Sequence, residues 1–251
     1  MVRFLWCAVL CCGFACGASA TETIHVFVAL ADNASQGLVP VPAKIGDGDK
    51  PEANLYWGCD EGMRAWFSRS KRWRRVAGPV SPQPDILERV VFRHAEKDVW
   101  LVADAWRGRE IRRCLQGYVR AAAGEDVEEV RVGETILKAG GASALVAYIG
   151  HNGLMEFDLE WMARQPPVPK PAITLCCLSQ SYFSEKLRQT GARPLLSTTQ
   201  LMYPGAFILH DALEVWLRDR DGRGVRDAAG RAYAKNQGIS VKAASGVFAM
   251  E

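Results

Sequence analysis

Two residues that could serve as a nucleophile and a base follow two short apolar runs in the second half of the chain. The run Ala144–Gly150 is followed directly by His151. The run Ala172–Leu175 is followed by Cys176 and Cys177. A cysteine thiol becomes a strong nucleophile once a neighbouring histidine takes its proton. These residue types therefore predict acyl-transfer or hydrolytic chemistry at a thiol.

Both runs have the composition of buried strands. Each is short, continuously apolar, rich in β-branched residues and flanked by Gly or Pro, which is typical of a parallel sheet covered on both faces. Ligands of open α/β sheets bind beyond the carboxyl ends of the strands. His151 and a cysteine should therefore share one crevice. Because side chains alternate along a strand, only one of Cys176 and Cys177 can face it.

The other patterns along the chain alternate between strand and helix. Four segments are predicted to run parallel in one sheet with helices on both faces: Ile24–Leu30, Ala144–Gly150, Ala172–Cys176 and Leu195–Thr198. Helices are predicted over Glu61–Trp73, Arg109–Ala123, Ser181–Arg188, Pro204–Arg218 and Val225–Asn236. The runs Ile86–Arg93 and Asp98–Ala105 favour a hairpin because only four residues separate them. The charged region Glu125–Gly141 is expected to hold one weak strand.

The remaining histidines and one cysteine have structural interpretations. His25 lies inside a predicted strand and is expected to be a core or edge residue rather than a ligand. His94 falls on the predicted hairpin turn and is expected at the surface. His210 is interpreted as a packing residue of its helix, with a role as a helix-borne base left open. Cys114 lies on the apolar face of a helix and is expected in the core.

A long loop without helical periodicity follows the first strand, from Ala31 to Leu55. Loops of this length inside compact domains are usually functional or disordered. This loop leaves the carboxyl end of its strand, so it should lie at the same sheet edge as His151. We expect the following residues to border the crevice and bind substrate: Asp32, Asn33, Gln36, Asn54 and Trp57. A purely structural loop pinned by Trp57 is the alternative.

The beginning of the chain has the pattern of a secretory signal peptide. A basic start at Arg3 is followed by the apolar run Phe4–Phe14 and the small-residue pattern Ala18–Ala20. We expect cleavage before Thr21, a single domain over residues 21–251, and a periplasmic or secreted location without membrane insertion of the mature chain. Lipid attachment at Cys16 is the weaker alternative.

Composition narrows the classes of partner. The chain of 251 residues has a formal net charge of +3, and its dense basic cluster, Arg69–Arg75, is interpreted as a solvated helix end rather than a nucleic-acid or anionic-surface site. Only four of the eight cysteines follow residue 20, too few for a disulfide scaffold, although a bridge between Cys59 and Cys114 remains open. No paired C-x-x-C motifs indicate zinc, and no metal or cofactor is expected.

An apolar strand ending in His-x-Gly, followed by a second ending in Cys-x-Ser, resembles the caspase-like clan of cysteine peptidases, which includes metacaspases, legumains and gingipains. The resemblance implies an α/β three-layer sandwich with a mostly parallel sheet. Aligned on Cys-x-Ser, it implies Cys177 as nucleophile and His151 as general base, acting on a peptide or protein substrate. Backbone N–H groups of Cys177 and of Gly153 or Asn152 are the candidate oxyanion donors.

A second resemblance covers three other segments. Asp32-Asn33 with Gln36-Gly37, Asn54–Gly58 and Gly150–Met155 are similar to segments of a group of exported bacterial proteins. This likeness indicates a family and no activity. Three functions are therefore considered: an exported cysteine peptidase, a catalytically inactive caspase-like binding domain, and a thiol hydrolase or transferase acting on a non-peptide acyl group.

Overall fold

The computed structural model describes residues 21–79, 81, 83–161, 163, 169–220 and 222–249. The expected signal peptide, residues 1–20, lies outside the described residues. Within the described part, eight strands form one sheet in the order β10-β9-β8-β7-β1-β4-β3-β2. The chain therefore has an α/β fold built on a large, mostly parallel sheet.

Five adjacent strands of this sheet are parallel. They are β1 (Glu22–Ala29), β4 (Val99–Trp106), β7 (Leu145–Ile149), β8 (Lys170–Leu175) and β9 (Ala192–Thr198). The remaining three, β2 (Trp73–Ala77), β3 (Ile86–His94) and β10 (Phe248–Ala249), pair antiparallel at the two edges. The predicted parallel set and the predicted hairpin of β3 and β4 are both confirmed.

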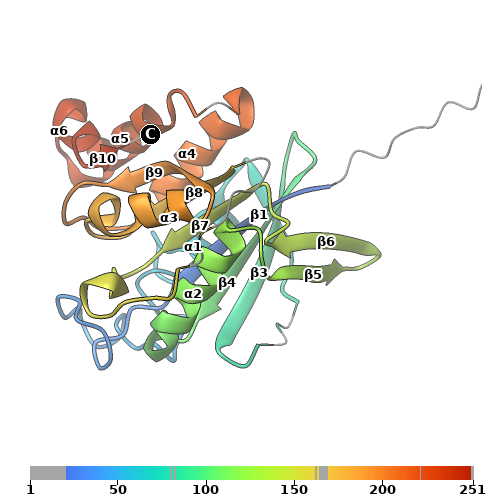
Figure 1. Ribbon diagram of the computed structural model, residues 1–251, viewed down its shortest axis with the longest axis horizontal. Coiled ribbons are helices and arrows are strands. Elements are labelled where there is room, and N and C mark those ends of the chain that lie inside the picture. The colour runs from blue at the N-terminus through green and yellow to red at the C-terminus, as the bar shows by residue number, and fades with distance from the viewer. Residues whose placement is uncertain are drawn as a thin grey trace, which may run out of the picture.

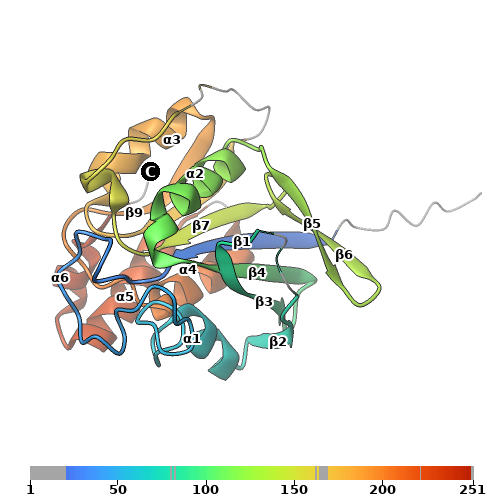
Figure 2. The same ribbon diagram turned by 90° about the horizontal axis from the view of Figure 1, so that it is seen from below.

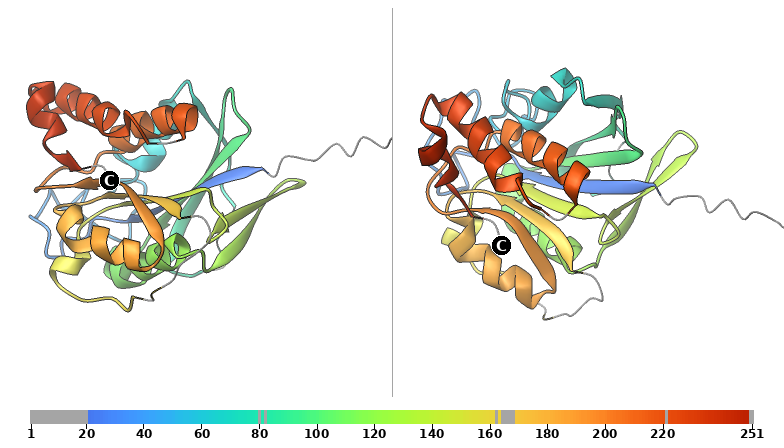
Figure 3. Two further views of the ribbon diagram at one scale, coloured as in Figure 1. Left: turned by 45° about the horizontal axis from the view of Figure 1, so that its top comes forward. Right: turned by 90° about the horizontal axis from the view of Figure 1, so that it is seen from above.

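Helices cover both faces of the sheet (Figure 2). On one face lie α1 (Met63–Arg69), α4 (Ala206–Asp219), α5 (Val225–Gln237) and α6 (Val241–Ser245). On the other lie α2 (Ile111–Ala122), extended at its start by the 3-10 turn η1 (Gly108–Glu110), and α3 (Glu185–Gln189), preceded by the π-helical turn η3 (Gln180–Ser184). The left view of Figure 3 shows the red C-terminal helices above the sheet and the green and orange helices below it.

The two helical layers explain why the parallel strands are apolar along their whole length. All five residues of β7 are buried, because alternate side chains enter opposite cores. Ala147 and Ile149 pack toward α4, whereas Val146 and Tyr148 pack toward α2. Burial on both faces is what the continuous apolar runs predicted.

The region Glu125–Gly141 forms two strands rather than one weak strand. β5 (Val127–Val132) and β6 (Thr135–Gly140) pair antiparallel and project from the body of the molecule (Figure 1). Val130, Leu137 and Ala139 of this hairpin pack against apolar residues of β3 and β4. Charged and apolar residues alternate along both strands, so that one face of the ribbon is buried, and the turn at Gly133 (φ 58°) closes it.

Two further expectations near β2 were wrong. The helix predicted over Glu61–Trp73 ends at Arg69, and Trp73 begins an edge strand with its indole N–H donating to Glu214 Oε1 over 3.0 Å. Two of the five basic residues of the cluster, Arg74 and Arg75, therefore lie on a charged edge strand, a common protection against edge pairing, and the other three lie at the end of α1 and in the turn that follows it. His94 is buried rather than exposed, because its Nδ1 accepts hydrogen bonds from the backbone N–H groups of Glu96 and Lys97 in the hairpin turn.

Candidate active site at the ends of two parallel strands

His151 and Cys177 occupy matching positions beyond the ends of neighbouring strands. β7 and β8 pair with Ile149 opposite Leu175, so both residues lie two positions past this pair. Asn152 links the loop after β7 to the turn after β8, because its side-chain N–H donates to the carbonyl oxygen of Cys177 over 2.7 Å. The loop after β7 and the turn after β8 therefore form one hydrogen-bonded unit at this sheet edge.

The imidazole of His151 forms a hydrogen bond to the carboxylate of Glu156, a residue absent from the site predicted by the sequence. Its Nε2 lies 2.5 Å from Glu156 Oε1, which also accepts the N–H of Gly37 over 2.8 Å. Because an ionised carboxylate only accepts, Nε2 carries the proton and Nδ1 is the basic nitrogen of the neutral ring. Nδ1 has no hydrogen-bond partner among the described residues. This matches the arrangement of a base oriented by an acid.

Burial separates the two adjacent cysteines. Cys176 is 0% exposed in the core beneath α2 and α3, and this burial raises the pKa of its thiol well above the ordinary value. Cys177 is half-buried on the opposite side, with its Sγ 3.5 Å from both the carbonyl oxygen and the amide nitrogen of Met202. The alternation of side chains at the end of β8 accounts for this difference. Cys177 is thus the more accessible nucleophile of the two.

The turn that carries Cys177 is strained and firmly held. Leu178 has φ 55°, a conformation that bulky residues rarely adopt and that is often retained at functional sites. Ser179 fixes the turn to β9: its N–H donates to Thr198 Oγ1 over 3.0 Å, and its Oγ accepts the N–H of Thr198 over 2.8 Å. The serine of the Cys-x-Ser motif therefore positions the thiol and does not face the crevice.

The predicted oxyanion donors need one correction. The N–H of Gly153 donates to the carbonyl oxygen of His151 over 3.1 Å and is not available to a substrate. Gly153 begins the 3-10 turn η2 (Gly153–Met155), and a Cβ here would lie 2.5 Å from Phe157. The glycine is therefore needed for close packing. The backbone N–H groups of Asn152 and Cys177 remain as candidates.

The loop after β1 lies at this edge, yet three of its predicted substrate-binding residues are buried and engaged. Gln36 donates to the carbonyl oxygens of Leu30 and Gly108, both over 2.9 Å. Asn54 is fully buried and exchanges two hydrogen bonds with the backbone of Ala31. The two amides therefore satisfy the backbone of the loop rather than a ligand.

The other loop residues are engaged as well. Trp57 is fully buried, and its indole N–H donates to Glu88 over 2.6 Å. Asp32 accepts from the N–H of Ala34 and from Ser35 Oγ, and Asn33 pairs with the backbone of Val41 in both directions. These contacts favour the alternative interpretation, a structural loop that is held in place in part by Trp57.

The residues that bring the loop to the site are Gly37 and Tyr56. Gly37 donates to Glu156, as described above. Tyr56 is buried, and this burial, with a smaller contribution from Cys177, raises the pKa of its phenol. The sequence contains one signal for Glu156, which is an acidic residue five positions after His151. Nothing in the sequence indicates that Met202 contacts the thiol.

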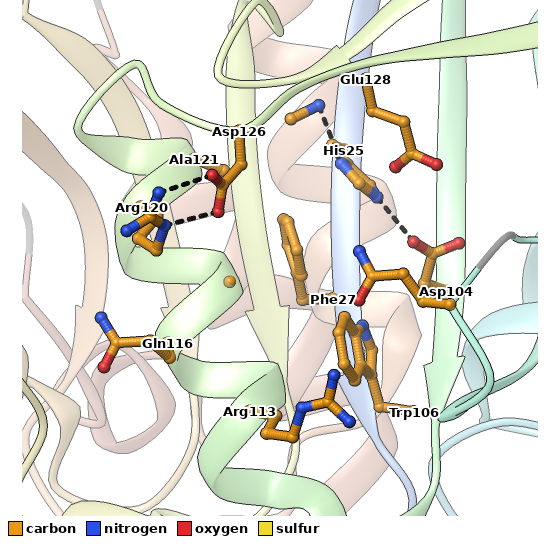
Figure 4. A pocket seen from close by; sticks show the side chains of 13 residues that line it. His25, Phe27, Asp104, Trp106, Arg113, Gln116, Arg120, Ala121, Asp126 and Glu128 are labelled. Atoms are coloured by element: carbon orange, nitrogen blue, oxygen red, sulfur yellow. Dashed lines mark hydrogen bonds and ion pairs between the residues drawn. The ribbon is translucent and has the colours of Figure 1, made fainter.

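A second polar region lies across the sheet, in a cavity of ≈ 210 Å³ between α2 and the β5–β6 hairpin. Figure 4 shows His25 and Asp104 on its sheet side, facing Arg113 and Arg120 of α2. His25 Nε2 lies 2.9 Å from Asp104 Oδ2, and its Nδ1 accepts the N–H of Gly140 over 3.0 Å. Both ring nitrogens are therefore engaged, in keeping with the prediction of a core histidine.

Asp104 is the centre of a buried ion-pair network. Arg89 donates to both of its carboxylate oxygens, over 2.6 and 2.7 Å, and also to Glu128 over 2.6 Å. Burial alone would raise the pKa of Asp104, but the hydrogen bonds from Arg89 and His25 outweigh it and hold that pKa below its ordinary value. Every charge in this network has a partner, which is the condition for burying charges at all.

None of the four cysteines in the described part of the chain forms a disulfide. Cys59 and Cys114 are both free: Cys114 lies on the buried face of α2, and the thiol of Cys59 contacts the carbonyl oxygen of Ala53. In the portion of the chain that the structure describes, no helix has the length and apolarity needed to cross a bilayer. The same residues include no cluster of three or more His, Cys, Asp or Glu side chains arranged to hold a metal ion.

Comparison of the chain with family models, with curated proteins and with solved structures found no match.

Proposed function

We propose that the chain is a caspase-like cysteine hydrolase that cleaves peptide bonds, with Cys177 as nucleophile, His151 as general base and Glu156 as the residue that orients the base. The observation that carries this proposal is the hydrogen-bonded unit at the ends of β7 and β8. There the Asn152 amide joins the histidine loop to the cysteine turn over 2.7 Å, and Glu156 holds the His151 ring over 2.5 Å. The resemblance to the caspase-like clan supports the same assignment.

The chemistry requires a transfer of the thiol proton. His151 Nδ1 takes the proton of Cys177 Sγ, and the thiolate attacks the substrate carbonyl carbon. The backbone N–H groups of Cys177 and Asn152 then stabilise the oxyanion. The protonated imidazole gives its proton to the leaving amine, and water, activated by the same base, hydrolyses the thioester to restore the thiol.

The thiol must change its hydrogen bond to react. It lies 3.5 Å from the carbonyl oxygen of Met202, so substrate binding has to exchange this contact for one with His151. Apo hydrogen bonds at catalytic sites are often long or poorly aligned. We further propose that residues 1–20 direct export and that the mature chain acts in the periplasm or outside the cell.

Alkylation with iodoacetamide, mapped by peptide mass spectrometry, tests the site. We expect Cys177 to be labelled at neutral pH, Cys177→Ala to abolish both this labelling and peptide hydrolysis, and His151→Ala to reduce hydrolysis by roughly 10²–10⁴-fold. Cys59→Ala, which removes another half-buried thiol, is the matched control and should leave hydrolysis unchanged.

The same experiment separates the alternatives. Labelling of Cys177 accompanied by cleavage of thioesters but not of peptides would favour a hydrolase or transferase for non-peptide acyl groups. A folded protein in which Cys177 resists alkylation would instead favour an inactive caspase-like binding domain. Labelling of Cys176 in place of Cys177 would contradict the assignment of the nucleophile.

A further inference from the structure

A second set of side chains with the geometry of a nucleophile, a base and an orienting acid lies on the opposite helical layer. Ser70 directly follows α1, and His210 and Asp211 lie on α4. Ser70 Oγ is 2.8 Å from His210 Nε2, and His210 Nδ1 is 2.8 Å from Asp211 Oδ1. The two helices are fixed together in part by Phe67, whose ring packs edge-on against that of His210 at 5.4 Å.

The hydrogen bonds of Ser70 determine which nitrogen of His210 carries the proton. A hydroxyl has one hydrogen to donate and two lone pairs to accept with. Both lone pairs of Ser70 Oγ are used, because the backbone N–H groups of Arg72 and Trp73 donate to it over 3.0 and 3.3 Å. The hydroxyl hydrogen must therefore point to His210 Nε2. The ring proton is then on Nδ1 and faces Asp211, as in a Ser-His-Asp triad.

The same two backbone donors would favour the reactive form of the serine. Hydrogen bonds to a group that is gaining negative charge stabilise its charged form. The N–H groups of Arg72 and Trp73 already point at Ser70 Oγ. They therefore stand ready to stabilise an alkoxide while His210 removes the proton.

A concave site of ≈ 350 Å³ adjoins the pair. Its lining is formed by Trp66, Arg69, Ser70, Lys71, Arg72 and His210. The indole of Trp66 provides an aromatic wall, with the Arg69 guanidinium 5.8 Å from its ring centroid, and Lys71 and Arg72 add two more cationic side chains to the lining. Lys71 forms no ion pair with any described residue, so its ammonium group is available to an anionic ligand. The site therefore suits a flat acyl or aryl group that carries a carboxylate.

We propose that Ser70, His210 and Asp211 form a second hydrolytic site, specific for small anionic aryl esters. Ser70 Oγ forms a bond to the ester carbonyl carbon while its proton passes to His210 Nε2. The bond to the leaving alcohol breaks, and that alcohol takes the proton from His210. Water then attacks the acyl-serine, with His210 again as base, and releases the carboxylic acid and the free serine.

The site shares no residue with the thiol site described above, so either can fail without the other. Asp211 is 49% exposed, which weakens its interaction with His210 relative to a buried triad acid. We therefore expect the loss of Asp211 to lower kcat by less than the roughly 10⁴-fold seen when a buried triad aspartate is replaced.

Fluorophosphonate labelling, mapped by peptide mass spectrometry, tests whether Ser70 is nucleophilic. We expect the adduct on Ser70 and its loss in Ser70→Ala. Ser68→Ala, on the exposed face of α1 two residues earlier, is the matched control and should keep the adduct. Because Ser70→Ala also removes an acceptor for two backbone N–H groups, Asp211→Asn provides a second test that leaves the turn intact.

Hydrolysis of para-acetoxybenzoate and of its neutral methyl ester is measured on the Cys177→Ala background, so that the thiol does not contribute. We expect Asp211→Asn to lower kcat by at least about tenfold for both esters. Lys71→Gln should raise KM for the anionic ester alone. Asp219→Asn, the same change at the end of α4, should alter neither kcat nor KM.

Two results would overturn this proposal. One is a folded protein in which Ser70 gains no adduct at excess fluorophosphonate. The other is ester hydrolysis that is unchanged in both Ser70→Ala and Asp211→Asn.

Discussion

The side chain of Asn152 donates a hydrogen bond to the carbonyl oxygen of Cys177 over 2.7 Å, across the ends of two parallel strands. The same amide accepts the N–H of Leu154 over 3.1 Å, which starts the turn η2. One buried asparagine thus sets both the path of the histidine loop and the position of the cysteine turn.

Replacement of Asn152 should loosen this unit. Asn152→Ala leaves a buried carbonyl and a buried N–H without partners, and we expect the free energy of unfolding to fall by about 1–3 kcal/mol. Urea denaturation measures the loss. The alkylation rate of Cys177 in the folded protein should also change. Asn33→Ala, which removes contacts to Val41 inside the loop after β1, should destabilise without changing that rate.

Alkylation should divide the four described cysteines into two classes. Cys59 and Cys177 are half-buried, whereas Cys114 and Cys176 are fully buried and burial raises the pKa of both thiols well above the ordinary value. We expect iodoacetamide to modify only the first pair under native conditions and all four residues in urea. Native modification of Cys176 at a rate similar to Cys177 would contradict the burial that separates them.

Removing the charge of Glu156 should impair His151 without unfolding the protein. Glu156→Gln keeps the shape of the side chain but weakens its hold on the protonated Nε2, so the thiolate fraction at Cys177 should fall. The measurement is the alkylation rate at neutral pH, for which we expect a decrease of several-fold. Asp158→Asn, a change of the same kind at an exposed position two residues on, should leave the rate unchanged.

The buried network at Asp104 should make stability depend on pH in the acid range. The folded-state pKa of Asp104 is lowered, so its contribution is fully present above the ordinary aspartate pKa of about 4 and is lost as the pH falls through the folded value. Asp104→Asn should cost roughly 3–5 kcal/mol at neutral pH, because Arg89 is left buried without its partner.

Urea denaturation of the Asp104→Asn variant and the parent chain, between about pH 3 and pH 7, measures this dependence. The difference between the two should shrink as the pH falls. Asp98→Asn, at an exposed position in the turn between β3 and β4, is the control and should show a small difference at every pH. A constant difference for Asp104→Asn across the range would contradict the assigned role of its charge.

The parallel strands and the placement of His151 and Cys177 were readable from the sequence. Runs such as Ala144–Gly150 are continuously apolar, and a segment of that length without polar residues must be buried on both faces, which in an α/β chain means a parallel strand. The direction of the strands then brings their carboxyl ends to one edge. Local periodicity and chain direction determine these features, so no knowledge of distant contacts is needed.

Hydrogen-bond partners were decided only by the tertiary structure. Gln36, Asn54 and Trp57 were expected to border the crevice, with a structural loop as the alternative, and each forms hydrogen bonds to other groups of the protein. Sequence patterns do not show which polar groups become paired in this way. Ser70 and His210 lie 140 positions apart and meet only because α1 and α4 pack on the same face. Backbone patterning follows from the order of the residues, whereas the pairing of polar side chains depends on which surfaces the folded chain removes from water.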